Sequence, residues 1–176
     1  MTTPLSPDSP HASRAQPAHG GDLEAASALH GVPAAGWLDL STGINPKAYP
    51  FVAPPLPVSA RLPDRALETA LIAAARRYYA TPAEIVAGAG TQAFIQALPR
   101  LRKGARVGVL TPSYSEHARA WHAAGHGVAE VSGIEQLAEY DVAVLVNPNN
   151  PDGRRTEPVR VLALAGAMAE TGGLLV

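Results

Sequence analysis

The sequence predicts an α/β fold of three layers, in which a mostly parallel sheet lies between helices. Short apolar segments alternate with longer segments of helical character along residues 106–176, and this alternation is typical of a parallel sheet. The segment 142–146 (Val-Ala-Val-Leu-Val) carries no polar residue, which indicates a strand buried on both faces. Such sheets gather their ligands beyond the carboxyl ends of the strands.

The chain divides into three predicted regions. Residues 1–18 contain four prolines among Ser, Ala and Gln, a composition that buries little surface, so we expect a disordered tail. Residues 19–63 are rich in Gly and Pro and predict an arm of irregular and short extended pieces. Residues 64–176 carry the α/β pattern.

The α/β region begins with a helix from Asp64, a capping residue, to Tyr79, with apolar side chains along one stripe. The segment Thr81–Glu84 has the spacing of a capping box with Pro in the first turn, and predicts a short helical turn. The elements of the sheet region are predicted strands at 106–110, 127–131, 141–146 and 173–176, and predicted helices at 114–124 and 157–171.

The composition is that of an ordinary globular protein. The 176 residues are 47% hydrophobic and 16% charged, which allows a sizeable core. The net charge of −1 provides no basic patch for nucleic acid. No apolar run approaches the roughly 20 residues of a membrane helix, and the N-terminus lacks the basic start and apolar block of a signal peptide. Without cysteine there are no disulfides. We expect a cytoplasmic protein that binds neither nucleic acid nor membrane.

The segment 147–153 (Asn-Pro-Asn-Asn-Pro-Asp-Gly) is a rigid, amide-rich turn that follows the buried strand. Pro148 and Pro151 fix their own φ angles and push Asn147 and Asn150 toward extended conformations, so both amides are held in place. An ordinary strand-ending turn has a similar composition. The segment alone therefore leaves a ligand site and a plain turn equally open.

A second strand-to-turn segment precedes a helix. Residues 85–87 predict a short strand, Gly90 lies in the turn, and the helix predicted over 91–98 has Thr91 as its cap and is ended or kinked by Pro99. Free N–H groups at a helix N-terminus suit a phosphate. A dinucleotide-binding fingerprint is absent, since no third Gly follows at the required spacing.

A third such segment leads from the strand 106–110 to Tyr114 at the start of a helix. An aromatic ring there can cover a ligand or simply pack on a neighbour. His117, His122 and His126 fall in or just after this helix. His122 and His126 have the four-residue separation of metal ligands, but Gly125 lies between them and no third ligand is obvious. We therefore expect solvent-facing or capping histidines and no metal site.

The turn 147–153 resembles the Asn-Pro-Asn-Asn-Pro-Thr-Gly turn of pyridoxal-phosphate enzymes of the aspartate-aminotransferase fold (fold type I), with Asp152 where Thr is usual. In that family the Asn before the second Pro, here Asn150, donates a hydrogen bond to the phenolic oxygen of the cofactor ring. Asn147 then supports the turn. The resemblance also suggests a cis Asn150–Pro151 bond.

The other two motifs match the same family. Gly90, Thr91 and Gln92 match its cofactor-phosphate cup, and Tyr114 matches the aromatic residue that stacks on the cofactor ring. The order and spacing of the three motifs make the resemblance specific. It implies that these residues and Asn150 lie close together at the carboxyl edge of the sheet and bind pyridoxal 5'-phosphate.

Three N-terminal segments, 19–22, 37–46 and 61–64, resemble the start of the threonine-phosphate decarboxylases, the cobalamin-pathway members of this fold. The resemblance covers roughly residues 19 to 176. It implies decarboxylation of L-threonine O-3-phosphate to (R)-1-amino-2-propanol O-2-phosphate by a homodimer. Leu62 departs from the Tyr with which many relatives reach the partner subunit's cofactor phosphate.

The same resemblance assigns the substrate. His19 and the backbone of Gly20 and Gly21 match part of the site for the substrate phosphate, and Asn45 matches part of the cleft. A phosphorylated amino acid is therefore the expected substrate. His19 could also be a tail residue beside two flexible glycines.

In this family the lysine that binds the cofactor covalently and the Asp that pairs with its pyridine nitrogen come later in the chain than residue 176. Lys47 and Lys103 fit solvated surface groups better, so we predict no catalytic residue here. We expect the N-terminal portion of a longer enzyme, with an incomplete large domain over 64–176. Alone it should be inactive and prone to self-association, because strand edges without neighbours are exposed.

Two alternatives stay open. The cofactor motifs do not choose between loss of a carboxylate and loss of a proton, so an aminotransferase of the histidinol-phosphate type fits them as well. The polypeptide could also be a truncated, non-catalytic piece that only binds a phosphate ligand or a partner chain.

Overall fold

The computed structural model describes residues 20–45, 47–56 and 60–176. Contacts divide the chain into two units, Met1–Tyr49 and Pro50–Val176. The predicted tail, residues 1–18, and the candidate substrate residue His19 lie outside the described residues.

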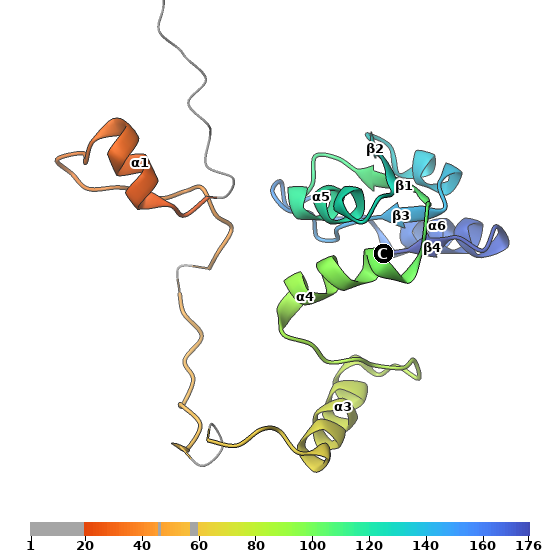
Figure 1. The fold of residues 1–176 in the computed structure, drawn as a ribbon, viewed down its shortest axis with the longest axis horizontal. Helices are drawn as coiled ribbons and strands as arrows, with labels where there is room; N and C mark the ends of the chain where they lie inside the picture. The colour runs from red at the N-terminus through yellow and green to blue at the C-terminus, as the bar shows by residue number, and fades with distance from the viewer. Residues whose placement is uncertain (1–19, 46, 57–59) are drawn as a thin grey trace, which may run out of the picture. The chain divides into compact units, whose positions relative to one another are not determined.

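The second unit contains a four-stranded parallel sheet, drawn in Figure 1. Its strands lie in the order β2-β1-β3-β4 and comprise β1 Arg106–Leu110, β2 Gly127–Val131, β3 Val142–Val144 and β4 Leu174–Leu175. The bounds of β1 and β2 are those that the sequence predicted. Strand β3 ends earlier than predicted, because beyond Val144 the ladder continues through one bond, from the Leu145 N–H to the Val176 carbonyl at 2.8 Å.

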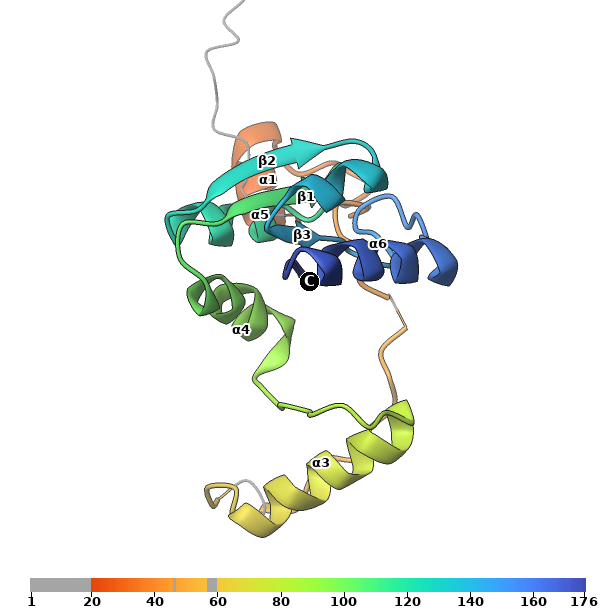
Figure 2. The same cartoon turned by 90° about the vertical axis from the view of Figure 1, so that its right-hand side faces the viewer.

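Helices cover both faces of the sheet, which confirms the predicted three layers (Figure 2). Helix α5, Ser115–Ala123, packs on one face, and helix α6, Pro158–Glu170, packs on the other with the 3₁₀ helix η2, Ile134–Glu139. Successive strand residues point to opposite faces. The α5 face buries Val107, Val109, Val142 and Val144 with Trp121, and the α6 face buries Leu110, Val131 and Ala143 with Leu137, Leu164 and Met168.

Two of the helices in the described part of the chain were not predicted. Helix η2 is too short to show a helical period in sequence. Helix α1, Leu23–His30, lies in the first unit, within the region predicted to be irregular or extended. Asp22 caps it by accepting a hydrogen bond from the Ala25 N–H at 2.8 Å. The Gly and Pro content on either side of this helix led to the prediction of an irregular region.

Helices α3, α4 and η1 lie between residue 64 and the first strand of the sheet. Helix α3, Arg65–Tyr79, is capped by Asp64 as predicted, but none of its residues is buried. Helix α4, Gly90–Ala97, continues into the 3₁₀ helix η1, Leu98–Leu101, so Pro99 changes the helix type where the sequence placed its end. In the described parts of the chain, no helix combines the length and apolar character needed to cross a membrane.

Two local predictions between α3 and α4 were wrong. Thr81–Glu84 forms no helical turn, because the Thr81 hydroxyl accepts a hydrogen bond from the Ala83 N–H at 3.2 Å and closes a shorter bend. Residues 85–87 form no strand, because a strand needs a hydrogen-bonded neighbour and no described strand pairs with them.

Candidate functional site

Two turns meet at the carboxyl edge of the sheet. Strands β1 and β3 are parallel neighbours, with Val109 opposite Val144, so the turns that follow them emerge on the same edge. The Asn149 amide donates a hydrogen bond to the Pro112 carbonyl at 2.8 Å. The turn after β3 is therefore joined directly to the turn that leads to Tyr114.

The asparagine turn is braced from within. Asn147 pairs with the backbone of Thr156 in both directions, at 3.1 and 3.0 Å, which agrees with its predicted supporting role. The buried Asn149 also donates to Asp152 at 2.7 Å, and Asp152 accepts the Arg154 N–H at 2.9 Å. Hydrogen bonds from the Arg154 backbone and then from Asn149 lower the pKa of Asp152. The carboxylate that replaces the usual Thr is thus a double acceptor in the turn.

Asn150 differs from both of these asparagines. Its side chain is exposed, and within the described residues its amide makes no hydrogen bond. The Asn150–Pro151 peptide bond is cis, as the sequence suggested. The amide is therefore available to a ligand at the edge of the sheet.

Tyr114 stands at the N-cap position of α5 and is half-buried. Its ring contacts the ring of His117 edge to face, with centroids 6.3 Å apart. Burial lowers the pKa of His117, so the neutral imidazole is favoured beside Tyr114. At the carboxyl edge of the sheet, the Tyr114 ring therefore packs against His117, a residue of helix α5.

The predicted phosphate cup is the uncapped N-terminus of α4. The helix begins at Gly90, whose φ of 77° is left-handed, and no side chain caps it. Thr91 is therefore the second residue of the helix and not its cap, which corrects the sequence prediction. The N–H groups of Thr91 and Gln92 have no acceptor within the helix, since its first hydrogen bonds form further along. Gly88 precedes the turn, and a side chain there would meet the Phe94 ring at 2.7 Å.

A contact between helices places this cup beside Tyr114. The Gln92 side chain donates a hydrogen bond to Glu116 at 3.3 Å, and Glu116 lies in the first turn of α5. Together with the link from Asn149 to Pro112, this contact connects all three predicted motifs. The second unit thus brings the cup, Tyr114 and the asparagine turn to one edge of the sheet.

The candidate substrate residues lie in the first unit. The Gly21 N–H donates to the Ser41 hydroxyl at 2.8 Å, and Ser41 donates in turn to Asp39 at 2.5 Å. Hydrogen bonds from the Ser41 hydroxyl and backbone lower the pKa of Asp39. A side chain at Gly20 would meet the Ser41 carbonyl at 2.3 Å, so the two glycines lie tightly over Ser41.

Asn45 has a local role in the same unit. Its side-chain oxygen accepts the Lys47 N–H at 2.9 Å. Its predicted place in a substrate cleft stays a prediction, as does the role of His19.

Several residues of the site were missed in the sequence. Glu116 lies outside the three motifs, Asn149 lies within the asparagine turn but was given no role, and His117 stood among histidines predicted to face solvent or cap. That prediction was also wrong for His126, which is buried, accepts the Ala105 N–H at Nδ1 and contacts the Pro99 carbonyl through Nε2 at 2.8 Å. Over the described residues, no cluster of His, Asp and Glu could hold a metal ion.

Lys103 lies away from these turns. It precedes β1, at the amino end of the strand, whereas the turns follow the carboxyl ends. A five-residue strand spans about 17 Å. This separation agrees with the interpretation of Lys103 as a surface group.

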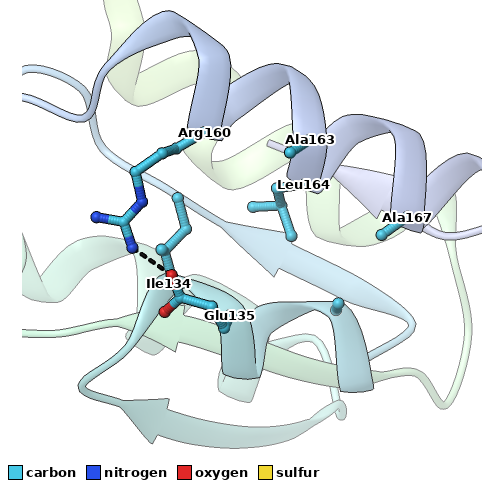
Figure 3. A pocket seen from close by; sticks show the side chains of 7 residues that line it. Ile134, Glu135, Arg160, Ala163, Leu164 and Ala167 are labelled. Atoms are coloured by element: carbon cyan, nitrogen blue, oxygen red, sulfur yellow. Dashed lines mark hydrogen bonds and ion pairs between the residues drawn. The ribbon is translucent and has the colours of Figure 1, made fainter.

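A separate apolar pocket of about 280 Å³ lies between η2 and α6 (Figure 3). Ile134, Ala163 and Leu164 are among its lining residues, and an ion pair between Arg160 and Glu135 stands beside them. Hydrogen bonds from its own backbone and from Arg160 lower the pKa of Glu135. None of the predicted site residues lines this pocket.

Comparison with known proteins decides the family. Residues 58–176 match the family described as aminotransferase class I and II. The chain belongs to that family. A threonine-phosphate decarboxylase from Pseudomonas aeruginosa is 48% identical over 89% of this chain and 47% of its own length. A second, from Sinorhizobium sp, is 43% identical over 89% of this chain and 48% of its length. The chain thus spans about half the length of the curated relatives that it matches.

A solved relative supports the fold. The histidinol-phosphate aminotransferase from Sinorhizobium meliloti, determined in complex with pyridoxal-5'-phosphate, is 31% identical and superimposes with a TM-score of 0.51. The match covers 61% of this chain and 33% of that protein. The parallel sheet with helices on both faces is therefore the aminotransferase fold, of which this chain contains a part.

Proposed function

We propose that this chain forms the pyridoxal-phosphate site of a threonine-phosphate decarboxylase. The complete enzyme would convert L-threonine O-3-phosphate to (R)-1-amino-2-propanol O-2-phosphate in cobalamin biosynthesis, and would act as a homodimer. The proposed activity follows the two curated relatives, at 48% and 43% identity. The observation that carries the proposal is the meeting of the three motifs through the contacts of Asn149 and Gln92.

The residues present fit the cofactor. The uncapped start of α4 offers the N–H groups of Thr91 and Gln92 and the positive end of the helix dipole to a phosphate. The half-buried ring of Tyr114 can cover one face of an aromatic ligand. The free amide of Asn150 can donate to the phenolic oxygen of the cofactor. The phosphate, the ring face and the phenolic oxygen of the cofactor thus each have a counterpart of matching chemistry.

When bound, pyridoxal phosphate accepts the electrons that remain when a bond to the substrate Cα breaks. The chain's own residues would fix positions. Gly90, Thr91 and Gln92 would hold the cofactor phosphate, and Tyr114 and Asn150 would hold the tilt of its ring. The backbone of Gly20 and Gly21, braced by Ser41, would hold the substrate phosphate together with His19 and Asn45.

This division of tasks explains how one cofactor can serve different reactions. The bond that breaks is the one held perpendicular to the cofactor ring, so the anchor of the substrate phosphate selects the reaction. Binding energy from a remote phosphate is then used to orient the reacting centre. The substrate residues, more than the cofactor residues, should decide the reaction.

An aminotransferase acting on a phosphorylated substrate is the second candidate, since the solved relative at 31% identity is a histidinol-phosphate aminotransferase. Product analysis separates the two. The protein expressed in its natural reading frame, supplied with threonine phosphate, should release carbon dioxide and aminopropanol phosphate. Transfer of the amino group to 2-oxoglutarate without carbon dioxide release would refute the decarboxylase and favour the second candidate.

A further inference from the structure

We propose that Glu116 is a positioning residue that keeps the Gln92 side chain away from the N-terminus of α4. Glu116 thereby leaves the N–H groups of that helix end open to the cofactor phosphate. The inference deepens the proposed function and rests on it.

Gln92 occupies a position from which its side chain could cap α4. Gln92 is the third residue of α4, the position from which a Gln or Glu side chain folds back and accepts the N-cap N–H in a capping box. In this chain no side chain caps the helix, and Gln92 reaches to Glu116 instead, with Nε2 3.3 Å from the carboxylate oxygen. A Gln92 side chain folded back in this way would place its oxygen at the helix end, in the space that a phosphate would need, and the hydrogen bond to Glu116 holds it elsewhere.

The charge of the Glu116 carboxylate is compensated within α5. The Glu116 side chain is only 13% exposed, and its other oxygen accepts a hydrogen bond from Arg119, one turn further along α5, at 3.1 Å. A bare carboxylate beside a phosphate would repel it. The guanidinium of Arg119 offsets this charge, so Glu116 can act as an acceptor near an anion.

Glu116 lies two residues after Tyr114, the N-cap residue of α5, so the bond to Gln92 also couples the phosphate cup to the residue proposed to cover the ring. A cofactor held at both its phosphate and its ring needs a constant spacing between the phosphate cup and Tyr114. The hydrogen bond between Gln92 of α4 and Glu116 of α5 fixes this spacing and also holds the Gln92 side chain away from the helix end.

Two conservative variants, made in the protein expressed in its natural reading frame, test the proposal. Glu116→Asp keeps the charge and the helix-start preference but is one methylene too short to reach Gln92. Glu116→Gln keeps the reach and an oxygen acceptor but removes the charge. The affinity of each apoenzyme is measured by titration with pyridoxal phosphate and with pyridoxal, which lacks the phosphate.

We expect Glu116→Asp to weaken pyridoxal phosphate binding roughly threefold to tenfold, the size of a helix-cap competition, and to leave pyridoxal binding unchanged. Glu116→Gln should stay within about twofold of the wild type, because its amide oxygen still accepts the hydrogen bond from Gln92. Adding Gln92→Ala to Glu116→Asp removes the competing side chain and keeps the backbone N–H, so it should restore most of the affinity.

Three results would overturn the inference: equal weakening by Glu116→Gln and Glu116→Asp, equal weakening toward pyridoxal, or no recovery with Gln92→Ala. The first would mean that the reach of the side chain to Gln92 does not decide binding, and the others that Glu116 only supports the fold. A wild-type protein that binds no pyridoxal phosphate would instead refute the proposed function.

Discussion

Asn147 and Asn150 belong to one turn but have different surroundings. Asn147 is bonded to Thr156 through both atoms of its amide, whereas the amide of Asn150 is free within the described residues. We predict that Asn150→Ala weakens pyridoxal phosphate binding about tenfold, the worth of one hydrogen bond to a polar ligand atom, and leaves the melting temperature unchanged. Asn147→Ala is the matched control and should lower the melting temperature. The same loss of stability in both variants would contradict the assignment.

His126 is a structural residue inside the sheet unit. Its ring satisfies the Ala105 N–H and contacts the Pro99 carbonyl, and it packs edge to face on Trp121 with centroids 4.9 Å apart. We predict that His126→Phe, which keeps a ring but no hydrogen bond, lowers the free energy of unfolding by about 2–4 kcal/mol, because two buried polar groups lose their partner. Urea denaturation measures the change. The exposed His122 gives the control, since His122→Phe should stay within about 0.5 kcal/mol of the wild type.

His117 should make stability depend on pH. Burial lowers its pKa below the ordinary value of about 6.5. As the pH falls below that value, the unfolded chain takes up a proton that the folded chain does not, so stability falls until the pH reaches the lowered pKa of the folded state. We predict that His117→Gln flattens the decline in unfolding free energy as the pH falls below about 6.5. His122→Gln should leave the decline in place, and an equal effect of both variants would refute the role of burial.

Sequence patterns predicted the elements that depend on local chemistry. The bounds of β1 and β2 agree because each is an apolar run that ends at a turn residue, and Asp64 marks the start of α3. Elements that depend on a neighbour were less predictable. Residues 85–87 have the composition of a strand but find no partner strand in the described chain, so their backbone stays irregular.

Gly108 shows how an element can depend on a glycine without any unusual backbone angle. A side chain at this position in β1 would meet the Tyr140 ring at 2.6 Å. We predict that Gly108→Ala lowers the free energy of unfolding by about 1–3 kcal/mol, because the ring must shift within a packed face. Gly127 in β2 is the matched control, since the nearest atom to an added side chain lies 4.0 Å away. Thermal denaturation of both variants checks the difference, and equal losses would contradict it.

The site as a whole required the folded chain. Its three motifs could be predicted because each is a strand-to-turn segment with its own composition. The contacts that join them could not, because Gln92 and Glu116 are 24 residues apart, and Pro112 and Asn149 are 37 apart. Such pairings follow from the order of the parallel strands and not from any local pattern. The roles of Glu116 and Asn149 as links between the motifs therefore became visible only in the structure.

The polypeptide of residues 1–176 should self-associate in solution, because helix α3 carries large apolar side chains that the described chain does not cover. Leu67 and Leu71 are 57% and 55% exposed and lie one turn apart, and exposed apolar surface of this kind favours association. We predict that Leu67→Gln with Leu71→Gln shifts the sedimentation profile toward the monomer, while Ala66→Gln with Ala70→Gln, also exposed on α3 but with little apolar area, does not. A wild-type polypeptide that sediments as a monomer at every concentration would show that this surface drives no association.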